Sequence, residues 1–206
     1  MKLVDLSNWI ENGMPTHPYD EKPNLFQDKF LEKDEFNNYK FDTGTHVGTH
    51  VDSPMHLTES SKFIGEYDLD RFCGKACIID VRGKAIINYE PQYANLIKEK
   101  DIVLLYTGFD KKYGDEAYYT SHPIIDMSFA EFLVREKIKM IGMDMPSPDR
   151  YPFQIHKYLF SNGLFILESL RNLSFLLSEK DIEVFAFPLR IKADASWVRA
   201  VARVGS

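Results

Sequence analysis

The sequence has few cysteines and no excess of positive charge, and each of these features excludes a class of protein. Its 206 residues include two cysteines, Cys73 and Cys77, which are too few for a disulfide framework and are expected to be reduced. The 25 basic residues are outnumbered by 31 acidic ones, and the formal net charge is -6. This balance argues against nucleic acid or an anionic membrane as a partner.

Long apolar segments are also missing. No run approaches the ~20 residues of a membrane-spanning helix. Asp5 interrupts the region where a signal peptide would carry its apolar core, so a cytoplasmic protein is expected. With 44% hydrophobic and 27% charged residues, and no internal repeat or linker, residues 1–206 are predicted to form one domain.

The sequence also lacks the G-x-S-x-G nucleophile elbow and the G-x-x-x-x-G-K-[ST] phosphate loop, so serine-hydrolase and P-loop interpretations have no support. Its most informative stretch instead covers residues 45–57, which read Thr-His-Val-Gly-Thr-His-Val-Asp-Ser-Pro-Met-His-Leu. Three histidines and an aspartate fall within eleven positions there: His46, His50, Asp52 and His56.

Alternation in this stretch predicts an extended strand. The odd positions of residues 45–51 are threonine or valine, whose β-branched side chains favour strands. Residues of one parity share a face of a strand, so the first two imidazoles and the carboxylate are expected to point the same way. Gly48, between them, would leave room for a metal and a substrate. Pro54 would end the strand and carry His56 off its line.

The side chains on this face are of the types that bind transition metals. Imidazole nitrogens and a carboxylate oxygen are the usual ligands of Zn²⁺ or Mn²⁺. The alternative is a set of ordinary polar residues in a turn-rich surface segment. Four potential ligands in one short stretch, three of them on one predicted face, favour the metal site.

Strands alternate with helices along the rest of the chain, which predicts an α/β fold. Residues 11–41 are expected to contain loops, and their aromatic part, residues 26–36, to form a helix or a flap that covers the site or makes a subunit interface. The predicted strands are residues 2–6, 75–81, 101–107, 139–144, 164–168, 182–191 and 197–203, and the predicted helices are residues 91–99, 127–137 and 152–162.

Further candidate residues follow the predicted strands. Glu168 ends a buried strand, where an unpaired carboxylate is costly and a metal would offset its charge. His156 lies on the preceding predicted helix. Trp9 follows the first strand and is either a core aromatic or a side chain beside the substrate. Ser147 and Asp149, in the turn after residue 144, either line the site or serve the turn alone.

The stretch His-Val-Gly-Thr-His-Val-Asp-Ser-Pro-Met-His resembles the H-x-G-T-H-x-D-x-P-x-H motif of the putative cyclase, or bacterial kynurenine formamidase, family of metal-dependent hydrolases. The resemblance extends over nearly the whole chain. His156 and Glu168 match the spacing of a later His and Glu in that family. Residues 144–149 are similar to its D-x-P-S-x-D turn, which makes Ser147 a candidate at the substrate site. Residues 194–200 resemble its closing D-x-S-P-V-R-A pattern, with Trp197 in place of the proline.

The resemblance implies a swivelling β/β/α fold, one or two divalent ions and frequent oligomerisation. We therefore expect a homodimer or a larger homo-oligomer. Transferred to this chain, the family pattern implies that Zn²⁺, or alternatively Mn²⁺, is bound by His46, His50, Asp52 and Glu168. The two carboxylates would bridge to a second ion, which His156 would complete.

This ligand set indicates a hydrolytic mechanism. A divalent ion lowers the pKa of a bound water from ~15.7 towards ~7, and the resulting hydroxide would attack a planar carbonyl. The ion would also stabilise the tetrahedral oxyanion. His56, close to the ions but beyond Pro54, is the expected proton shuttle to the leaving amine.

The resemblance implies an aryl formamide as the substrate, such as N-formylkynurenine of tryptophan catabolism, with Trp9 beside its ring. A related alternative is the opening of a cyclic amide or lactone, as in isatin hydrolysis, or a cyclisation. An alternative of a different class is a non-catalytic metal-binding or ligand-binding protein. The presence of His56 beside a complete ligand set argues against this last alternative, because binding alone needs no proton shuttle.

Overall fold

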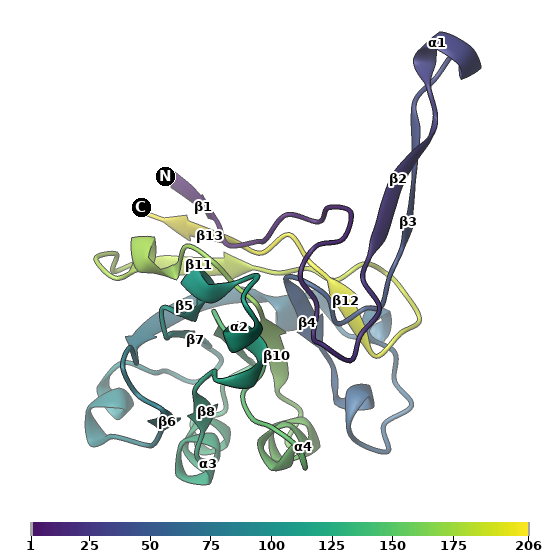
Figure 1. The fold of residues 1–206 in the computed structure, drawn as a ribbon. Coiled ribbons are helices and arrows are strands. Elements are labelled where there is room, and N and C mark those ends of the chain that lie inside the picture. Colours follow the sequence, from purple (N-terminus) through teal and green to yellow (C-terminus); the bar gives the residue numbers. More distant parts are fainter. Residues whose placement is uncertain (1, 206) are drawn as a thin grey trace.

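A curled mixed β-sheet forms the centre of the computed structural model, which describes residues 2–205 (Figure 1). The first and last residues of the predicted domain therefore lie outside the described residues. Within residues 2–205 the sheet has nine strands, which in spatial order are β1 (Lys2–Asp5), β13 (Val201–Val204), β11 (Ile182–Phe185), β5 (Cys73–Asp80), β7 (Ile102–Tyr106), β9 (Met140–Met143), β10 (Phe165–Glu168), β4 (His50–Asp52) and β12 (Ala195–Trp197).

The middle of the sheet is parallel and its two sides are antiparallel. Strands β5, β7, β9 and β10 pair in parallel, and helices α3 (Met127–Arg135) and α4 (Gln154–Ser161) lie in the crossovers that lead to β9 and β10. Antiparallel strands extend the sheet through β11 on one side and through β4 on the other. Helices therefore pack on a sheet with a parallel centre, and the α/β prediction is confirmed.

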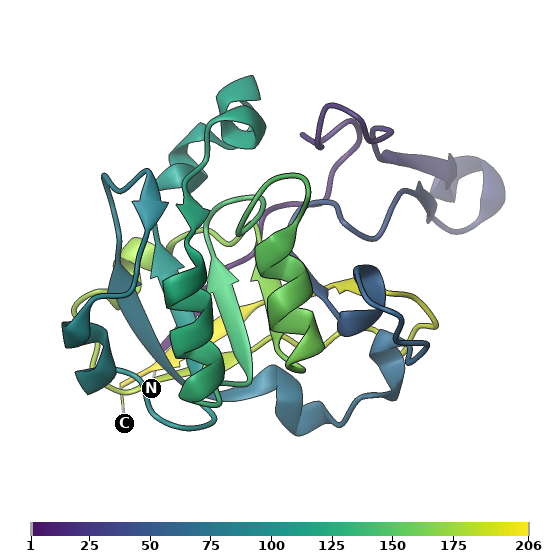
Figure 2. The ribbon, with the colours of Figure 1, turned by 90° about the horizontal axis from the view of Figure 1, so that it is seen from below.

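Hydrophobic residues on the two faces of the sheet form two core clusters. Strand β7 contributes to both, because its side chains alternate: Ile102 and Leu104 pack in one cluster, Val103 and Leu105 in the other. Helices α3 and α4 cover the second cluster (Figure 2). All five residues of β7 are buried, as is typical of a parallel strand that is covered on both faces.

The remaining elements are short. Strands β6 and β8 form a small parallel sheet, and the predicted helix over residues 91–99 is only a 3-10 turn. The bounds of these elements are β6 (Ile86–Ile87), β8 (Ile124–Ile125), α2 (Glu116–Thr120), η1 (Pro54–His56), η2 (Ile64–Glu66), η3 (Leu69–Phe72), η4 (Pro91–Asn95), η5 (Phe109–Lys112) and η6 (Leu173–Leu176). Across residues 2–205, no helix is long and apolar enough to cross a membrane.

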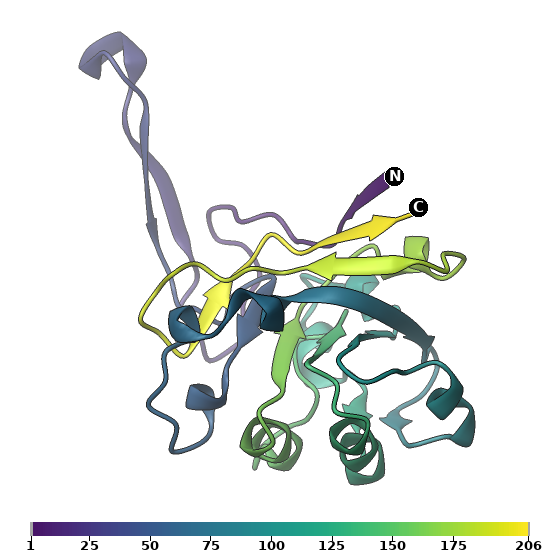
Figure 3. The same cartoon turned by 180° about the vertical axis from the view of Figure 1, so that it is seen from behind.

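The expectation of a helix in residues 26–36 is met only by a four-residue helix at the tip of a hairpin, and the segment forms no flap over the chain's own sheet. Strands β2 (Asn24–Lys29) and β3 (Asn38–Asp42) form an antiparallel hairpin, and the four-residue helix α1 (Leu31–Asp34) forms its tip. The hairpin extends away from the sheet instead of folding over it (Figures 1 and 3). The ladder between β2 and β3 supplies the backbone hydrogen bonds that a helix would have made locally. Glu35, at φ 65°, turns the chain after α1.

Two predicted strands at the C-terminal end are shorter or divided. Strand β11 stops at Phe185, ahead of Pro188, which has no N–H for a ladder. The predicted strand over residues 197–203 is divided into β12, which pairs with β4, and β13, which pairs with β1 and β11. This division matters for function because it carries residue 194 to the same part of the sheet as β4.

Candidate metal centre

The register of β4 against β10 brings the predicted ligands together. His50 pairs with Glu168, and Asp52 pairs with Ile166 two residues further along. Alternate residues of a strand share a face, so the side chains of His50, Asp52 and Glu168 project to the side of the sheet that α4 covers. His156 lies on α4 and approaches the same group from the helix that covers this face of the sheet.

Side-chain distances confirm this convergence. The Nε2 atom of His50 lies 3.3 Å from Oδ1 of Asp52 and 3.5 Å from Oε2 of Glu168. The Nε2 atom of His156 lies 3.3 Å from Oε1 of Glu168. Glu168 therefore uses both carboxylate oxygens, one towards each imidazole, which is the arrangement expected of a bridging carboxylate.

His46 reaches the group from a loop, so the predicted strand over residues 45–51 is wrong for its first part. The strand begins only at His50, because Gly48 adopts φ +65°, a left-handed conformation that interrupts an extended chain. A Cβ at Gly48 would lie 2.7 Å from Cε of Met14, the end of a flexible side chain. The left-handed turn therefore accounts for a glycine at this position, and the room that it would leave for a metal stays a prediction. His46 nevertheless places Nδ1 2.9 Å from Oδ1 of Asp52.

Hydrogen bonds at the outer ring nitrogens set the tautomers of the two more buried histidines. The Nδ1–H of His50 donates to the carbonyl oxygen of Gly48 at 2.8 Å, and that of His156 donates to Oδ1 of Asp149 at 2.5 Å. When either ring is neutral, its Nε2 lone pair then faces the carboxylates. Such outer contacts orient metal-binding histidines and fix their tautomer. Asp149 also accepts from the backbone N–H of Ile155 and so anchors the start of α4.

His46 is held in the reverse orientation by Asp194, a residue that was not among the predicted site residues. The Nε2–H of His46 donates to Oδ2 of Asp194 at 2.8 Å, which leaves the Nδ1 lone pair towards Asp52. The same oxygen accepts from Nδ1–H of His56 at 2.9 Å. The sequence signal for Asp194 is its place as the first residue of the segment that resembles the family's closing motif.

His56 lies beside this cluster, on η1, as its position after Pro54 predicts. Its ring centroid is 4.0 Å from that of His46, and 29% of its side chain is exposed. Its Nε2 makes no hydrogen bond with any residue in the described range. His46, Asp52 and His56 also form a possible ligand group, so the geometry alone permits His56 as a ligand.

The charges of the site fit a bound cation. Asp52 and Glu168 are 1% and 5% exposed, and within residues 2–205 their ion pairs are with histidines alone. Burial lowers the pKa of His46, but the carboxylates of Asp52 and Asp194 raise it to about 11. Burial also lowers the pKa of His156, whereas Asp149 and Glu168 raise it to about 9. Protonated imidazoles thus offset the buried negative charge in the absence of a metal.

Unpaired buried atoms mark where a cation would bind. His50 Nε2, Asp52 Oδ1 and Glu168 Oε1 are buried and have no hydrogen-bond partner. One ligand atom from each of these residues lies within 4.8 Å of the others. Imidazole nitrogens and carboxylate oxygens are suitable ligands for a divalent metal, so the donor set fits a divalent cation.

The two predicted substrate residues lie outside this group. Trp9 is 76% exposed, so the alternative of a core aromatic is wrong. Asn8 ties the Trp9 loop to the site by donating to Oγ1 of Thr49 and to the carbonyl oxygen of Ser169, the neighbours of His50 and Glu168. The hydroxyl of Ser147 donates to the backbone oxygen of Asp149, a contact within its own turn.

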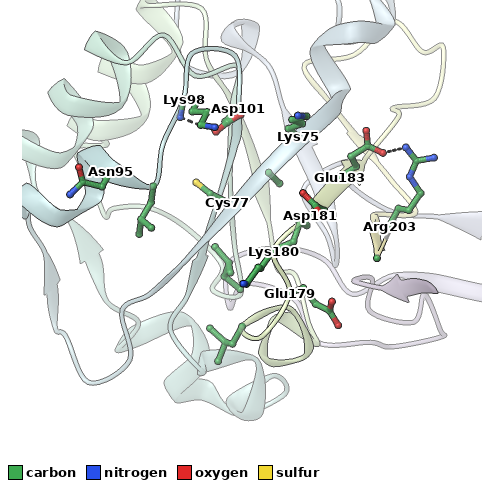
Figure 4. Close-up of a pocket in the computed structure, with 16 residues that line it drawn as sticks. Lys75, Cys77, Asn95, Lys98, Asp101, Glu179, Lys180, Asp181, Glu183 and Arg203 are labelled. Carbon is green, nitrogen blue, oxygen red and sulfur yellow. Dashed lines mark hydrogen bonds and ion pairs between the residues drawn. The ribbon is translucent and has the colours of Figure 1, made fainter. Parts of the chain in front are cut away.

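A cavity of about 900 Å³ lies elsewhere, along β5, β11 and β13 (Figure 4). Strands β7 and β9 separate it in the sheet from β10 and β4. It is lined by equal numbers of acidic and basic side chains, and none of the predicted site residues lines it. This mixture of charges does not define a ligand class, so the cavity is not a candidate for the predicted chemistry.

Comparison with known proteins identifies the family. The putative cyclase family matches residues 4–150. The kynurenine formamidase of Bacillus cereus is 30% identical to this chain over 206 aligned residues, which cover 97% of the chain and 96% of the relative. The chain therefore belongs to the putative cyclase family. His156, Glu168 and Asp194 lie beyond the part matched by the family but within that full-length alignment.

Solved structures agree with the fold. A potential metal-dependent hydrolase with cyclase activity has a TM-score of 0.77 and 25% identity, with coverage of 98% of this chain and 96% of the other. An isatin hydrolase bound to the product analogue thioisatinate has a TM-score of 0.85 and 23% identity, with coverage of 98% and 91%. The predicted fold class is thus confirmed, and the relatives and the donor set together support a metal-dependent hydrolase.

Metal binding is predicted to require His50 and Glu168. Purified His50→Ala and Glu168→Ala proteins should lose most of the divalent metal found in the wild type by elemental analysis, because each removes a buried donor without a substitute. His17→Ala, which alters an exposed histidine, is the matched control and should retain the metal. Full metal content in folded samples of both site variants would show that the ion binds elsewhere.

Proposed function

We propose that this member of the putative cyclase family hydrolyses an aryl formamide, with His46, His50, Asp52, His156 and Glu168 as metal ligands and His56 as the proton shuttle. The observation that carries the proposal is the convergence of these donors beside His56, an imidazole with one unpaired nitrogen in the described chain. Zn²⁺ is the proposed metal and Mn²⁺ the alternative, because imidazole and carboxylate ligands suit both. The kynurenine formamidase relatives support the formamide.

The reaction breaks the bond between the formyl carbon and the aryl nitrogen, and it consumes water to release formate and an aryl amine. A divalent cation held by the ligand set supplies Lewis acidity, which lowers the pKa of a water molecule from ~15.7 towards ~7 and polarises a carbonyl group. His56 accepts the proton of the attacking water at Nε2 and delivers it to the leaving nitrogen. The Nδ1–H of His56 remains hydrogen-bonded to Asp194 throughout, so the ring keeps its orientation.

The surroundings of the site favour a flat, uncharged substrate group over a phosphate. No lysine or arginine in the described range pairs with the carboxylates of the site, whereas phosphate groups are usually recognised by such side chains. Trp9 offers an exposed ring on a loop tied to the site, and an aromatic side chain packs well on an aryl group. Ser147 donates to the backbone oxygen of Asp149 in the turn before α4, and it is the second proposed substrate-binding residue.

His56 is predicted to be needed for turnover and not for metal binding. His56→Ala should keep the metal content of the wild type but lose about 10²–10⁴-fold in kcat, the usual contribution of general acid–base catalysis. Elemental analysis and steady-state kinetics on the same preparation test both parts, with His17→Ala as the control. Loss of metal would instead favour His46, Asp52 and His56 as a ligand group, and near-normal turnover would assign the proton transfer to another residue.

The substrate assignment predicts that kcat/KM for N-formylkynurenine exceeds that for isatin and for simple lactones with the metal-loaded enzyme. Trp9→Ala should raise KM more than it lowers kcat, because packing on the ring stabilises the bound substrate and the transition state equally. Tyr151→Ala, another highly exposed aromatic, is the control. If the formamide is the poorest substrate of the panel, the enzyme opens cyclic amides or lactones with the same site.

We further propose that the protein assembles as a homodimer or a larger homo-oligomer through the β2–β3 hairpin. A two-stranded hairpin is marginally stable in water unless another surface covers it. Six apolar side chains of the hairpin are 37–62% exposed, namely Phe26, Phe30, Leu31, Phe36, Tyr39 and Phe41. An exposed apolar patch of this kind marks a surface for association. A second copy of the chain is the partner that is always present to cover it.

Charge at the tip of the hairpin is therefore predicted to dissociate the assembly. Light scattering coupled to size-exclusion chromatography should give at least twice the monomer mass for the wild type and the monomer mass for Leu31→Glu/Phe36→Glu. Leu69→Glu, at an exposed leucine outside the hairpin, is the control and should assemble normally. A monomeric wild type, or an unchanged mass in the double variant, would rule out this interface.

A further inference from the structure

One oxygen of Asp194 contacts both a proposed metal ligand and the proposed proton shuttle. Its Oδ2 accepts from Nε2–H of His46 at 2.8 Å and from Nδ1–H of His56 at 2.9 Å. We propose that Asp194 is a positioning residue that sets the tautomer and orientation of both imidazoles at once. The inference rests on the proposed function, in which His46 binds the metal and His56 carries the proton.

The backbone around Asp194 holds the carboxylate in place. Ser53, which is fully buried, donates to the carbonyl oxygen of Asp194 from its N–H at 3.0 Å and from its hydroxyl at 2.7 Å. Ala195, the next residue, starts β12 and pairs with Asp52 on β4. The carboxylate therefore projects from the end of a paired strand, close to the ligand Asp52, and not from a free loop.

The two imidazoles need opposite tautomers, and a single acceptor between them provides both. His46 must keep its proton on Nε2 so that Nδ1 offers a lone pair on the side of Asp52. His56 must keep its proton on Nδ1 so that Nε2 is free to accept a proton. The hydrogen bond at one ring nitrogen decides which tautomer an imidazole adopts. Without Asp194, neither ring retains the acceptor that selects its working tautomer.

The position of the second carboxylate oxygen distinguishes Asp194 from an ordinary surface acid. Oδ1 has one partner in the described range, the hydroxyl of Thr45 at 3.4 Å, so both short contacts of the carboxylate are with imidazoles. Asp149 orients His156 in the same manner but contacts no second imidazole. Asp194 is thus the residue through which the proposed metal site and the proposed proton shuttle are connected.

The test uses zinc-loaded, full-length protein in which the six histidines carry ¹⁵N. Imidazole nitrogen shifts report the tautomer of each ring, and competition with a chelator reports zinc affinity. Wild-type His56 should carry its proton on Nδ1. In Asp194→Ala this signature should disappear, zinc affinity should fall about 10–100-fold, and kcat at saturating zinc should fall about 10²-fold or more.

Two further variants separate positioning from general damage. Asp194→Asn retains an oxygen of the same reach, so it should restore much of the His56 tautomer signature and of the zinc affinity. Asp126→Asn alters an aspartate that caps α3, outside the site, and should match the wild type in every readout.

Unchanged tautomers and zinc affinity in folded Asp194→Ala would overturn the inference, whatever the enzyme hydrolyses. If the wild type hydrolyses no formamide but Asp194→Ala still changes the His56 tautomer and the zinc affinity, the proposed substrate fails and the positioning role stands.

Discussion

Burial of two carboxylates is the constraint around which the molecule is arranged. Asp52 and Glu168 lie in the interior with histidines as their only ion-pair partners in the described chain. An uncompensated charge at such depth costs several kcal/mol even after relaxation, so the fold is stable only if positive charge is supplied. The surrounding imidazoles can supply it as protons, and a divalent cation can supply it with the imidazoles neutral. The buried negative charge that would destabilise the fold therefore also creates affinity for a metal.

The sheet makes this burial possible by its change from parallel to antiparallel pairing. Strand β10 ends the parallel part, and the antiparallel β4 places His50 directly beside Glu168. Strand β12 then closes the other side of β4 and brings Asp194 to the outer nitrogens of His46 and His56. Asp149 fixes α4 and His156 together. Each of the three ligand histidines thus has an acceptor at its outer nitrogen, which is Asp194 for His46, Gly48 for His50 and Asp149 for His156.

The hairpin and the site belong to different parts of the fold and serve different proposed purposes. The hairpin projects from the sheet and carries exposed apolar residues, whereas the proposed ligands His50, Asp52 and Glu168 lie on buried strands. Rigid strands give a metal site the precision that ligation needs. A projecting arm provides area for association without disturbing that precision. Assembly and chemistry can therefore be altered separately by substitution.

Local sequence determined which types of metal-binding side chain this protein carries, and the tertiary structure determined which of them lie together. The spacing of His46, His50, Asp52 and His56, together with the acid at the end of a buried strand, predicted a metal site. Short apolar runs predicted most strands of the large sheet. The parity argument failed at His46, because the left-handed conformation of Gly48 keeps the residues before His50 out of the strand. Asp194 meets His56 across 138 positions of sequence, so periodicity cannot reveal the contact. The pairing of β12 with β4 determines the contact between Asp194 and His56. Pairing between such distant segments depends on the whole sheet and not on any local pattern.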